Sequence, residues 1–211
     1  MIIEHAGKRP TIDPTSSIAY DATVCGDVTI GPNTRVLYGA RIIGENSGKI
    51  SIGADCIVME NAVIRATPKH GCTIGDCCLI GPNAHVVGAV LEDEVFVATS
   101  VAIFHGARLG QGSEVRPHAT VHLRTHLPAG ATVPIGWIAV GDPVHILSPE
   151  RHEEIWAVQK PLHFPDWVYG VPRDTPHRMR QITRTLCDSL SALETDRVVY
   201  QEDDSRGEMA H

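Results

Sequence analysis

The sequence has few aromatic residues and no long apolar run. Phe, Trp and Tyr make up 5% of the 211 residues, and no stretch approaches the roughly 20 apolar residues that a membrane-spanning helix needs. Basic residues number 18 and acidic ones 25, so the net charge of −7 argues against a surface for nucleic acid or anionic lipid. We therefore expect no nucleic-acid and no membrane partner. The opening segment also lacks the charged-then-apolar order of a secretory signal, and we expect a cytoplasmic protein.

Turn-forming residues are frequent instead, with 19 glycines and 14 prolines, and between them an aliphatic residue recurs at every sixth position. The fourth residue after each of these positions is usually small. The aliphatic positions are Ile12, Ile18, Val24, Ile30, Val36, Ile42, Ile52, Val58, Ile64, Ile74, Ile80, Val86, Leu91, Val97, Ile103, Leu109, Val115, Val121, Leu127 and Val133. A six-residue period of this kind is typical of hexapeptide repeats, which form a parallel β-helix.

Three steps in the repeat are irregular, and they indicate the shape of the coil. The steps that follow Ile42 and Ile64 are ten residues long, and the step that follows Val86 is five. When three repeats are counted per coil, all three irregular steps fall at the corner between the third face and the first. We therefore predict a three-sided prism over residues 1–147, whose coils pair at a spacing of about 4.8 Å.

The cysteines and histidines do not fit a metal site within this repeat. No Cys-x-x-Cys pair is present among the six cysteines, and we interpret them as small buried residues. His118, His122 and His126 recur every four residues, but they occupy different positions of a six-residue period. We therefore do not expect these three histidines to converge on one ion.

The C-terminal part of the chain has a different pattern. Ser148 and Pro149 are typical of the N-cap and first residue of a helix, which we predict over residues 149–160. Later prolines predict an extended connector, and apolar residues at helical spacing predict a helix over 177–194. The predicted fold class is all-β, a three-sided parallel β-helix with C-terminal α-helices. The three expected parts are the β-helix of residues 1–147, a helical extension of 148–195 and a disordered acidic tail of 196–211.

Three segments resemble the γ-class carbonic anhydrases, which belong to the left-handed β-helix superfamily. They are GARIIGE at 39–45, IVMENAVIR at 57–65 and IGPNAHVVG at 80–88, together with the irregular step after Ile64. The resemblance implies a left-handed coil and a homotrimer whose sites lie between subunits. The same superfamily also contains acyltransferases that use coenzyme A.

The resemblance further implies a zinc ion held by three histidines, two from one subunit and one from its neighbour. Their positions hold Arg65, Pro82 and Val87 in this sequence. Other polar positions of the family fall on Ile43, Glu45, Met59 and Glu60. A catalytic zinc site needs nitrogen donors at its ligand positions, and without them no zinc-bound hydroxide forms near neutral pH. We therefore predict no metal, no cofactor and no zinc-dependent hydration of carbon dioxide.

Arg65, at one of these implied ligand positions, indicates that the site binds an anion rather than a metal ion. Its planar guanidinium can hold a carboxylate or a similar anion through two hydrogen bonds. We predict a small-anion pocket at the subunit interface, with Glu45, Glu60 and Arg65 as its ligand-binding residues. The alternative is that Arg65 pairs with Glu60 across a subunit contact and that nothing binds.

Four histidines are the candidate catalytic residues. His85, His105 and His122 are candidates for proton transfer near Arg65, although we expect His85 and His105 on different faces of the prism. His70, in the excursion TPKHGC, is the candidate base if the protein is instead an acyltransferase with coenzyme A as cofactor. A third alternative is a structural or assembly subunit that docks through its C-terminal helices and connector.

Overall fold

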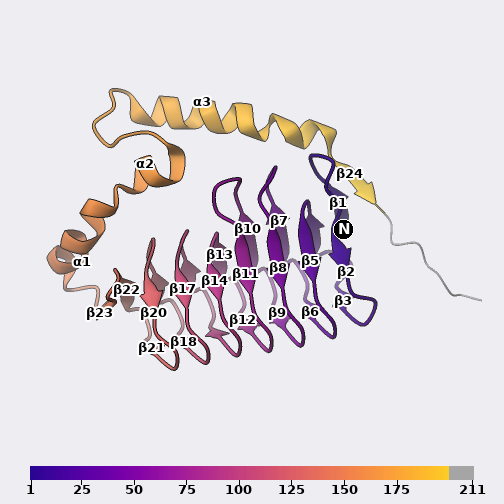
Figure 1. Cartoon of the computed structure of the whole chain (residues 1–211), viewed down its shortest axis with the longest axis horizontal. Coiled ribbons are helices and arrows are strands. Elements are labelled where there is room, and N and C mark those ends of the chain that lie inside the picture. Colours follow the sequence, from indigo (N-terminus) through magenta and orange to yellow (C-terminus); the bar gives the residue numbers. More distant parts are fainter. Residues whose placement is uncertain (200–211) are drawn as a thin grey trace, which may run out of the picture.

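The chain forms one long coil with a triangular cross-section, followed by helices that lie beside it (Figure 1). The computed structural model describes residues 1–199, whose strands belong to three sheets. The ten-stranded sheet contains, in spatial order, β23 (His145–Leu147), β22 (Ile138–Val140), β19 (Thr120–Val121), β16 (Ala102–Ile103), β13 (His85–Val87), β10 (Val63–Ala66), β7 (Arg41–Gly44), β4 (Thr23–Cys25), β1 (Ile2–Glu4) and β24 (Arg197–Val199).

The other two sheets have seven strands each. One contains β2 (Thr11–Ile12), β5 (Val28–Ile30), β8 (Ile50–Ile52), β11 (Cys72–Ile74), β14 (Val90–Leu91), β17 (Arg108–Leu109) and β20 (His126–Leu127). The other contains β21 (Thr132–Val133), β18 (Glu114–Val115), β15 (Phe96–Val97), β12 (Leu79–Ile80), β9 (Ile57–Val58), β6 (Arg35–Val36) and β3 (Ser17–Ile18). The predicted fold class is confirmed: the protein is an all-β, three-sided, left-handed parallel β-helix with C-terminal α-helices.

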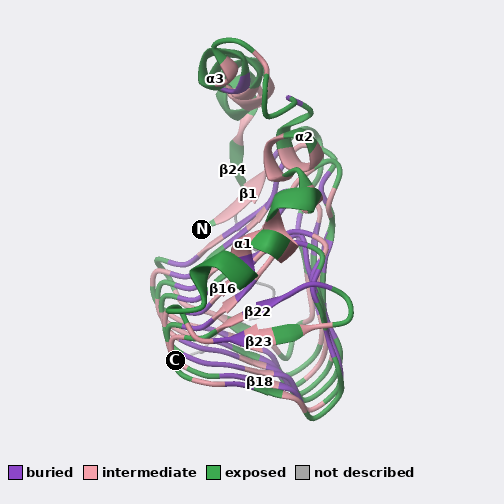
Figure 2. Cartoon of the chain, turned by 90° about the vertical axis from the view of Figure 1, so that its left-hand side faces the viewer, coloured by how far each residue is buried: buried purple, intermediate pink, exposed green. Residues whose placement is uncertain are grey.

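The six-residue repeat produces the coil because each aliphatic residue stacks on its equivalent in the next turn. Ile64 pairs with Ile42 on one side and with Val86 on the other, and none of the three is exposed. The small residues at the corners, such as Ala62 and Ala84, are at most 1% exposed. Figure 2 shows these buried positions lining the inside of the three-sided coil. A narrow interior of this kind has no room for many aromatic side chains, which explains their scarcity.

The three irregular steps lie at one corner, as predicted. They connect β7 to β8, β10 to β11 and β13 to β14, and each therefore joins the ten-stranded sheet to the sheet that begins with β2. The second excursion is a tight turn in which Thr67 and His70 bridge to each other in antiparallel fashion. These excursions form the rim beside which the C-terminal helices lie.

The helical extension differs in detail from the prediction. Helix α1 (His152–Gln159) begins after Arg151 rather than at Pro149, and the 3₁₀ turn η1 (Lys160–Leu162) follows it. The expected extended connector contains α2 (Phe164–Tyr169), because Pro165 stands in the first turn of a helix, where proline is tolerated. The second predicted helix is α3 (Arg178–Leu190) with the 3₁₀ turn η2 (Ser191–Thr195).

The prediction of a disordered tail was wrong at its beginning. Residues Arg197–Val199 form β24, which pairs antiparallel with β1. This pairing occurs because β1 otherwise leaves one edge of the ten-stranded sheet open, and Val198 and Val199 suit a strand. Residues 200–211, including the acidic run at 202–204, lie outside the described part of the chain.

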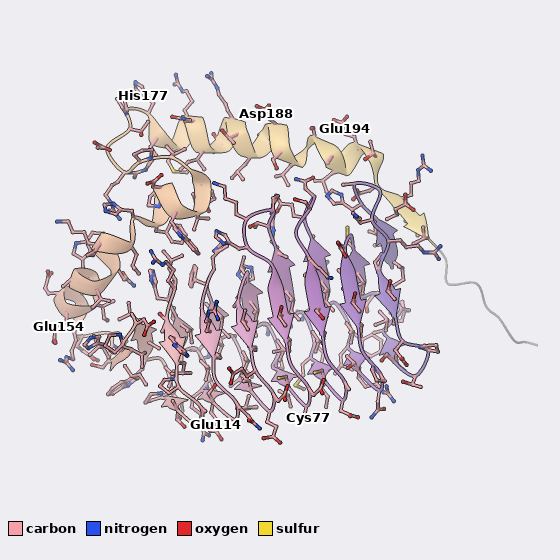
Figure 3. All side chains as sticks on the ribbon, in the orientation of Figure 1. Cys77, Glu114, Glu154, His177, Asp188 and Glu194 are labelled. Atoms are coloured by element: carbon pink, nitrogen blue, oxygen red, sulfur yellow. The ribbon has the colours of Figure 1, made fainter. Side chains whose placement is uncertain are left out.

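Two further features of the described chain bear on the expectations from sequence. Four of the cysteines are buried as expected, but Cys77 and Cys187 are exposed. In Figure 3, Cys77 lies at the side of the coil opposite α3. Within residues 1–199, no helix is both long enough and apolar enough to cross a membrane.

Candidate ligand-binding site

A cavity of about 420 Å³ lies between the β-helix and its own C-terminal helices. One wall comes from β10, β13 and β16 and from the turn at 67–69, and the other comes from α2 and α3. In Figure 3, some side chains of α3 point toward the strands, whereas the labelled Asp188 lies on the far side of that helix. The sequence predicts a pocket between subunits, and residues of a single chain line this one.

The polar end of the cavity is formed by Arg65 and Glu45. Arg65 Nε donates to Glu45 Oε2 at 3.0 Å, and Nη2 donates to the same oxygen. Glu45 is only 7% exposed, so its charge depends on this partner, while the Arg65 side chain is 39% exposed. Lys69 also borders the cavity and adds a second positive charge. With these two cations and one carboxylate, the charged groups that line the cavity carry a net positive charge.

The remaining wall is apolar and comes from segments distant in sequence. Phe104 follows β16 and meets Phe164 of α2 edge to face, with ring centroids 6.2 Å apart. Tyr169 meets Phe164 in the same way at 6.0 Å. Ile182 of α3 is 3% exposed and closes the cavity together with Leu186. The cavity thus combines a cationic end with an apolar body, as is usual for small-molecule sites.

Two of the predicted catalytic histidines border the cavity together. His85 in β13 and His105 after β16 both line it, so the expectation that they lie on different faces was wrong. The prediction assigned His105 to a face from its position in the six-residue repeat. In the structure, His105 lies at the corner that directly follows β16, which belongs to the same sheet as β13. Burial, followed by the charges of His70, His85 and Arg65, lowers the pKa of His105 to about 4. Burial and then Arg65 lower the pKa of His85.

His70 lies behind His105 rather than in the lining of the cavity. Its ring stacks on Trp167 of α2 at 4.1 Å between centroids and meets His105 edge to face at 5.3 Å. Gly88 and Gly106 make this arrangement possible. A Cβ on Gly88 would lie 2.6 Å from the Cβ of His70, and one on Gly106 would lie 2.7 Å from the Trp167 ring. The stack therefore attaches α2 to the second excursion.

The last two predicted site residues do not line the cavity. His122 contacts Phe104 at 5.7 Å between ring centroids, and burial lowers its pKa. Glu60 lies in the turn after β9, and within the chain Arg65 pairs with Glu45. The alternative of an Arg65–Glu60 pair across a subunit contact stays a prediction. Sequence reasoning missed Lys69, Phe164 and Ile182, because nothing in the repeat shows which segment the helices cover. The apolar spacing of α3 was the one available signal.

His105 makes the stability of the protein depend on pH. Its folded-state pKa of about 4 lies below the ordinary 6.5, so the unfolded chain takes up a proton first as the pH falls. The contribution of His105 to the free energy of unfolding should therefore decrease between pH 6.5 and 4, by up to about 3 kcal/mol, and change little below that range. Urea titrations at several pH values measure this slope. His105→Gln should reduce it and His152→Gln, on exposed α1, should not; equal slopes in both variants would contradict the assignment.

The residues present do not fit the zinc ion of the γ-class carbonic anhydrases. Arg65 and Val87, at two of the ligand positions implied by the family, are direct neighbours in register on β10 and β13. A guanidinium and an isopropyl group offer no donor to a metal. The His and Glu side chains around this cavity also do not bring three ligand atoms together, since the one such group within residues 1–199 lies elsewhere.

Comparison with known proteins agrees with this fold. No protein-family profile matches the chain. It is 28% identical over 154 residues to gamma carbonic anhydrase 1, mitochondrial, of Arabidopsis thaliana. The aligned region covers 70% of this chain and 54% of that protein. It is 26% identical over 112 residues to a carbonic anhydrase of Geobacillus kaustophilus, covering 53% of this chain and 61% of that one. A crystal structure of an acetyltransferase-like protein from Bacillus cereus superimposes with a TM-score of 0.57 at 20% identity, over 76% of this chain and 91% of that one.

The fold and the comparisons together define the class of protein. It is a hexapeptide-repeat protein with a left-handed parallel β-helix. Within that class, its sequence is similar to those of γ-class carbonic anhydrases, at 28% and 26% identity. The chain spans about half the length of the curated relatives it matches.

Proposed function

We propose that this protein binds a small carboxylate with an apolar body in the cavity between the β-helix and helices α2 and α3. One cavity of about 420 Å³ is lined by Arg65 and Lys69 and by an aromatic and aliphatic wall, and this observation supports the proposal. The proposal does not include zinc-dependent hydration of carbon dioxide, because the ligand positions of that site hold Arg65, Pro82 and Val87.

Arg65 has the free donors that such a ligand needs. Its bonds to Glu45 use Nε and Nη2, so the Nη1 group has no hydrogen-bond partner within residues 1–199. Glu45 already neutralises the charge of Arg65. Lys69 supplies a second positive charge, which leaves the site with a net positive charge. A carboxylate between these groups would gain charge-assisted hydrogen bonds. Its hydrocarbon part would then contact Phe104 and Phe164.

The two histidines that line the cavity act as neutral partners near pH 7. With a pKa of about 4, His105 is uncharged there and can accept or donate one hydrogen bond. His85 is exposed to solvent on one side, so a proton that it takes from a bound molecule can pass to water. We assign His85 as the proton-transfer residue of any reaction at this site and His105 as a residue that positions the ligand.

The predicted trimer remains part of the proposal, but the cavity does not depend on it. Every residue that lines the cavity comes from one chain. The acyltransferase alternative rests on His70, whose ring is enclosed between Trp167 and His105. This alternative also requires coenzyme A binding. Within residues 1–199, no observation favours coenzyme A binding over carboxylate binding.

The test uses hexanoate, benzoate and acetate as probes, with binding measured by thermal shift and isothermal calorimetry. Hexanoate or benzoate should raise Tm, because a ligand of the native state stabilises it, whereas acetate should do little. Arg65→Lys keeps the charge but loses the planar fork, and it should weaken binding about tenfold. Lys69→Ala should weaken it as well, and Ile182→Trp should abolish it by filling the cavity.

Arg108→Lys, on the exposed side of β17, is the matched control and should bind as the wild-type chain does. The proposal fails if none of the three probes binds the wild-type chain. It also fails if a probe binds equally well to the Ile182→Trp variant.

A further inference from the structure

The beginning of the coil holds a cluster of metal-ligating side chains, none of which lines the cavity. His5 follows β1, Cys25 ends β4, and Asp196 precedes β24. One ligand atom from each of them lies within 4.8 Å of the other two. His5 and Cys25 are 3% and 5% exposed, and the side chain of Asp196 is 23% exposed.

The pairing of three neighbouring strands explains why these side chains meet. Cys25 pairs with Ile3 across the parallel strands β1 and β4. Arg197 pairs with Glu4 across the antiparallel strands β1 and β24, which places Asp196 opposite His5. Since side chains alternate along a strand, Ile3 and His5 point to the same face, and their partners Cys25 and Asp196 point there too. The cluster is therefore produced by the register of the sheet and not by an accidental surface contact.

The hydrogen bonding of His5 leaves part of its ring unsatisfied. Nδ1 contacts Asp196 Oδ1 at 2.6 Å, but the buried Nε2 has no partner within the described chain. Buried polar atoms without a partner are uncommon and ask for an explanation. The backbone of His5 is held in place by two hydrogen bonds to Lys8, so the ring is presented by a fixed turn.

We propose that His5, Cys25 and Asp196 bind a divalent transition metal ion of the zinc type. An imidazole nitrogen, a thiolate and a carboxylate oxygen are the donors that zinc uses, at about 2.0–2.3 Å, and calcium or magnesium would not select a thiolate. Water reaches the partly exposed Asp196 and completes a tetrahedral set. The ion would connect residues that are up to 191 positions apart in the chain, and so fasten β24 and the adjoining η2 and α3 to the first coils.

The experiment is a titration of the chelator-treated full-length protein with cobalt(II), followed by competition with zinc(II). A thiolate–cobalt charge-transfer band should appear and reach its maximum at one equivalent, and zinc should abolish it and raise Tm. Cys25→Ser should lose the band. Asp196→Asn, a near-isosteric change at a partly exposed position, should weaken binding at least about tenfold, as removal of a ligand does.

Cys77→Ser and Cys187→Ser, which alter the two exposed cysteines, are the controls and should keep the band. The proposal is overturned if no thiolate band appears, or if the band survives in Cys25→Ser. It is also overturned if Asp196→Asn, which retains the fold, binds cobalt as tightly as the wild-type chain.

Discussion

Arg65→Ala is expected to lower the free energy of unfolding by about 2 kcal/mol or more. The reason is Glu45, which is 7% exposed and would keep a buried negative charge without its partner. Removal of one member of a buried ion pair costs about 3–5 kcal/mol, and the partial exposure of Arg65 reduces this by solvent screening. Urea unfolding with an unchanged m-value measures the loss.

The double variant Arg65→Ala with Glu45→Gln, together with the single Glu45→Gln, separates this effect from simple loss of packing. It removes both charges, so most of the stability should return, with a coupling energy of about 1–2 kcal/mol in the mutant cycle. Arg116→Ala is the matched control, because the pair of Arg116 with Glu114 is exposed on both sides. That change should cost less than about 1 kcal/mol. If Arg65→Ala cost no more than Arg116→Ala, the structural role assigned to the Arg65–Glu45 pair would be wrong.

Gly88→Ala is expected to have the second large effect, with a loss of about 3 kcal/mol. The residue has a φ of +55°, a region that costs an L-amino acid about 1–2 kcal/mol. Its Cβ would also lie 2.6 Å from the Cβ of His70 and 3.3 Å from Cδ2 of His105. The turn at 67–70 and the His105 ring must therefore move, and with them the polar side of the cavity.

Gly112→Ala provides the control for backbone conformation alone. Gly112 has a similar φ of +64°, and a Cβ there would meet nothing within 4 Å. We expect this change to cost about 1 kcal/mol and to leave binding of hexanoate or benzoate intact, whereas Gly88→Ala should lose both stability and binding. Equal Tm values for the two variants would show that the close contact at Gly88 has no energetic consequence.

The repeat is the part of the protein that sequence reasoning recovers most fully. The positions of Ile42, Ile64 and Val86 predicted both the stacking and the corner at which the coil is irregular, and the structure has both. This succeeds because a coil of period six is a local pattern, in which each residue contacts its equivalent one turn away. The helix boundaries were less accurate, since prolines are compatible both with an extended segment and with the first turn of a helix.

The candidate site was only partly predictable from the same sequence. Glu45 was named with Arg65 because a polar position of the family falls on it, and the structure pairs the two residues. Glu60 does not line the cavity, and Lys69, which does, was missed. The repeat predicts which residues point outward. It does not predict which of those residues a distant segment covers. His105 illustrates the difference, because its lowered pKa results from burial and from its contact with His70 rather than from its place in the repeat.

By itself, then, the sequence determined the three-sided coil and its corner of irregular turns, and it predicted Arg65 at a position where the family resemblance implies a metal ligand. Only the tertiary structure decided that α2 and α3 fold back over that corner and enclose a cavity, and that β24 brings Asp196 to His5 and Cys25. The physical reason is the range of the interactions. Stacking of coils acts between residues about 18–22 positions apart, as between Ile42 and Ile64, whereas docking of the C-terminal segment depends on packing over more than a hundred residues, for which the repeat contains no signal.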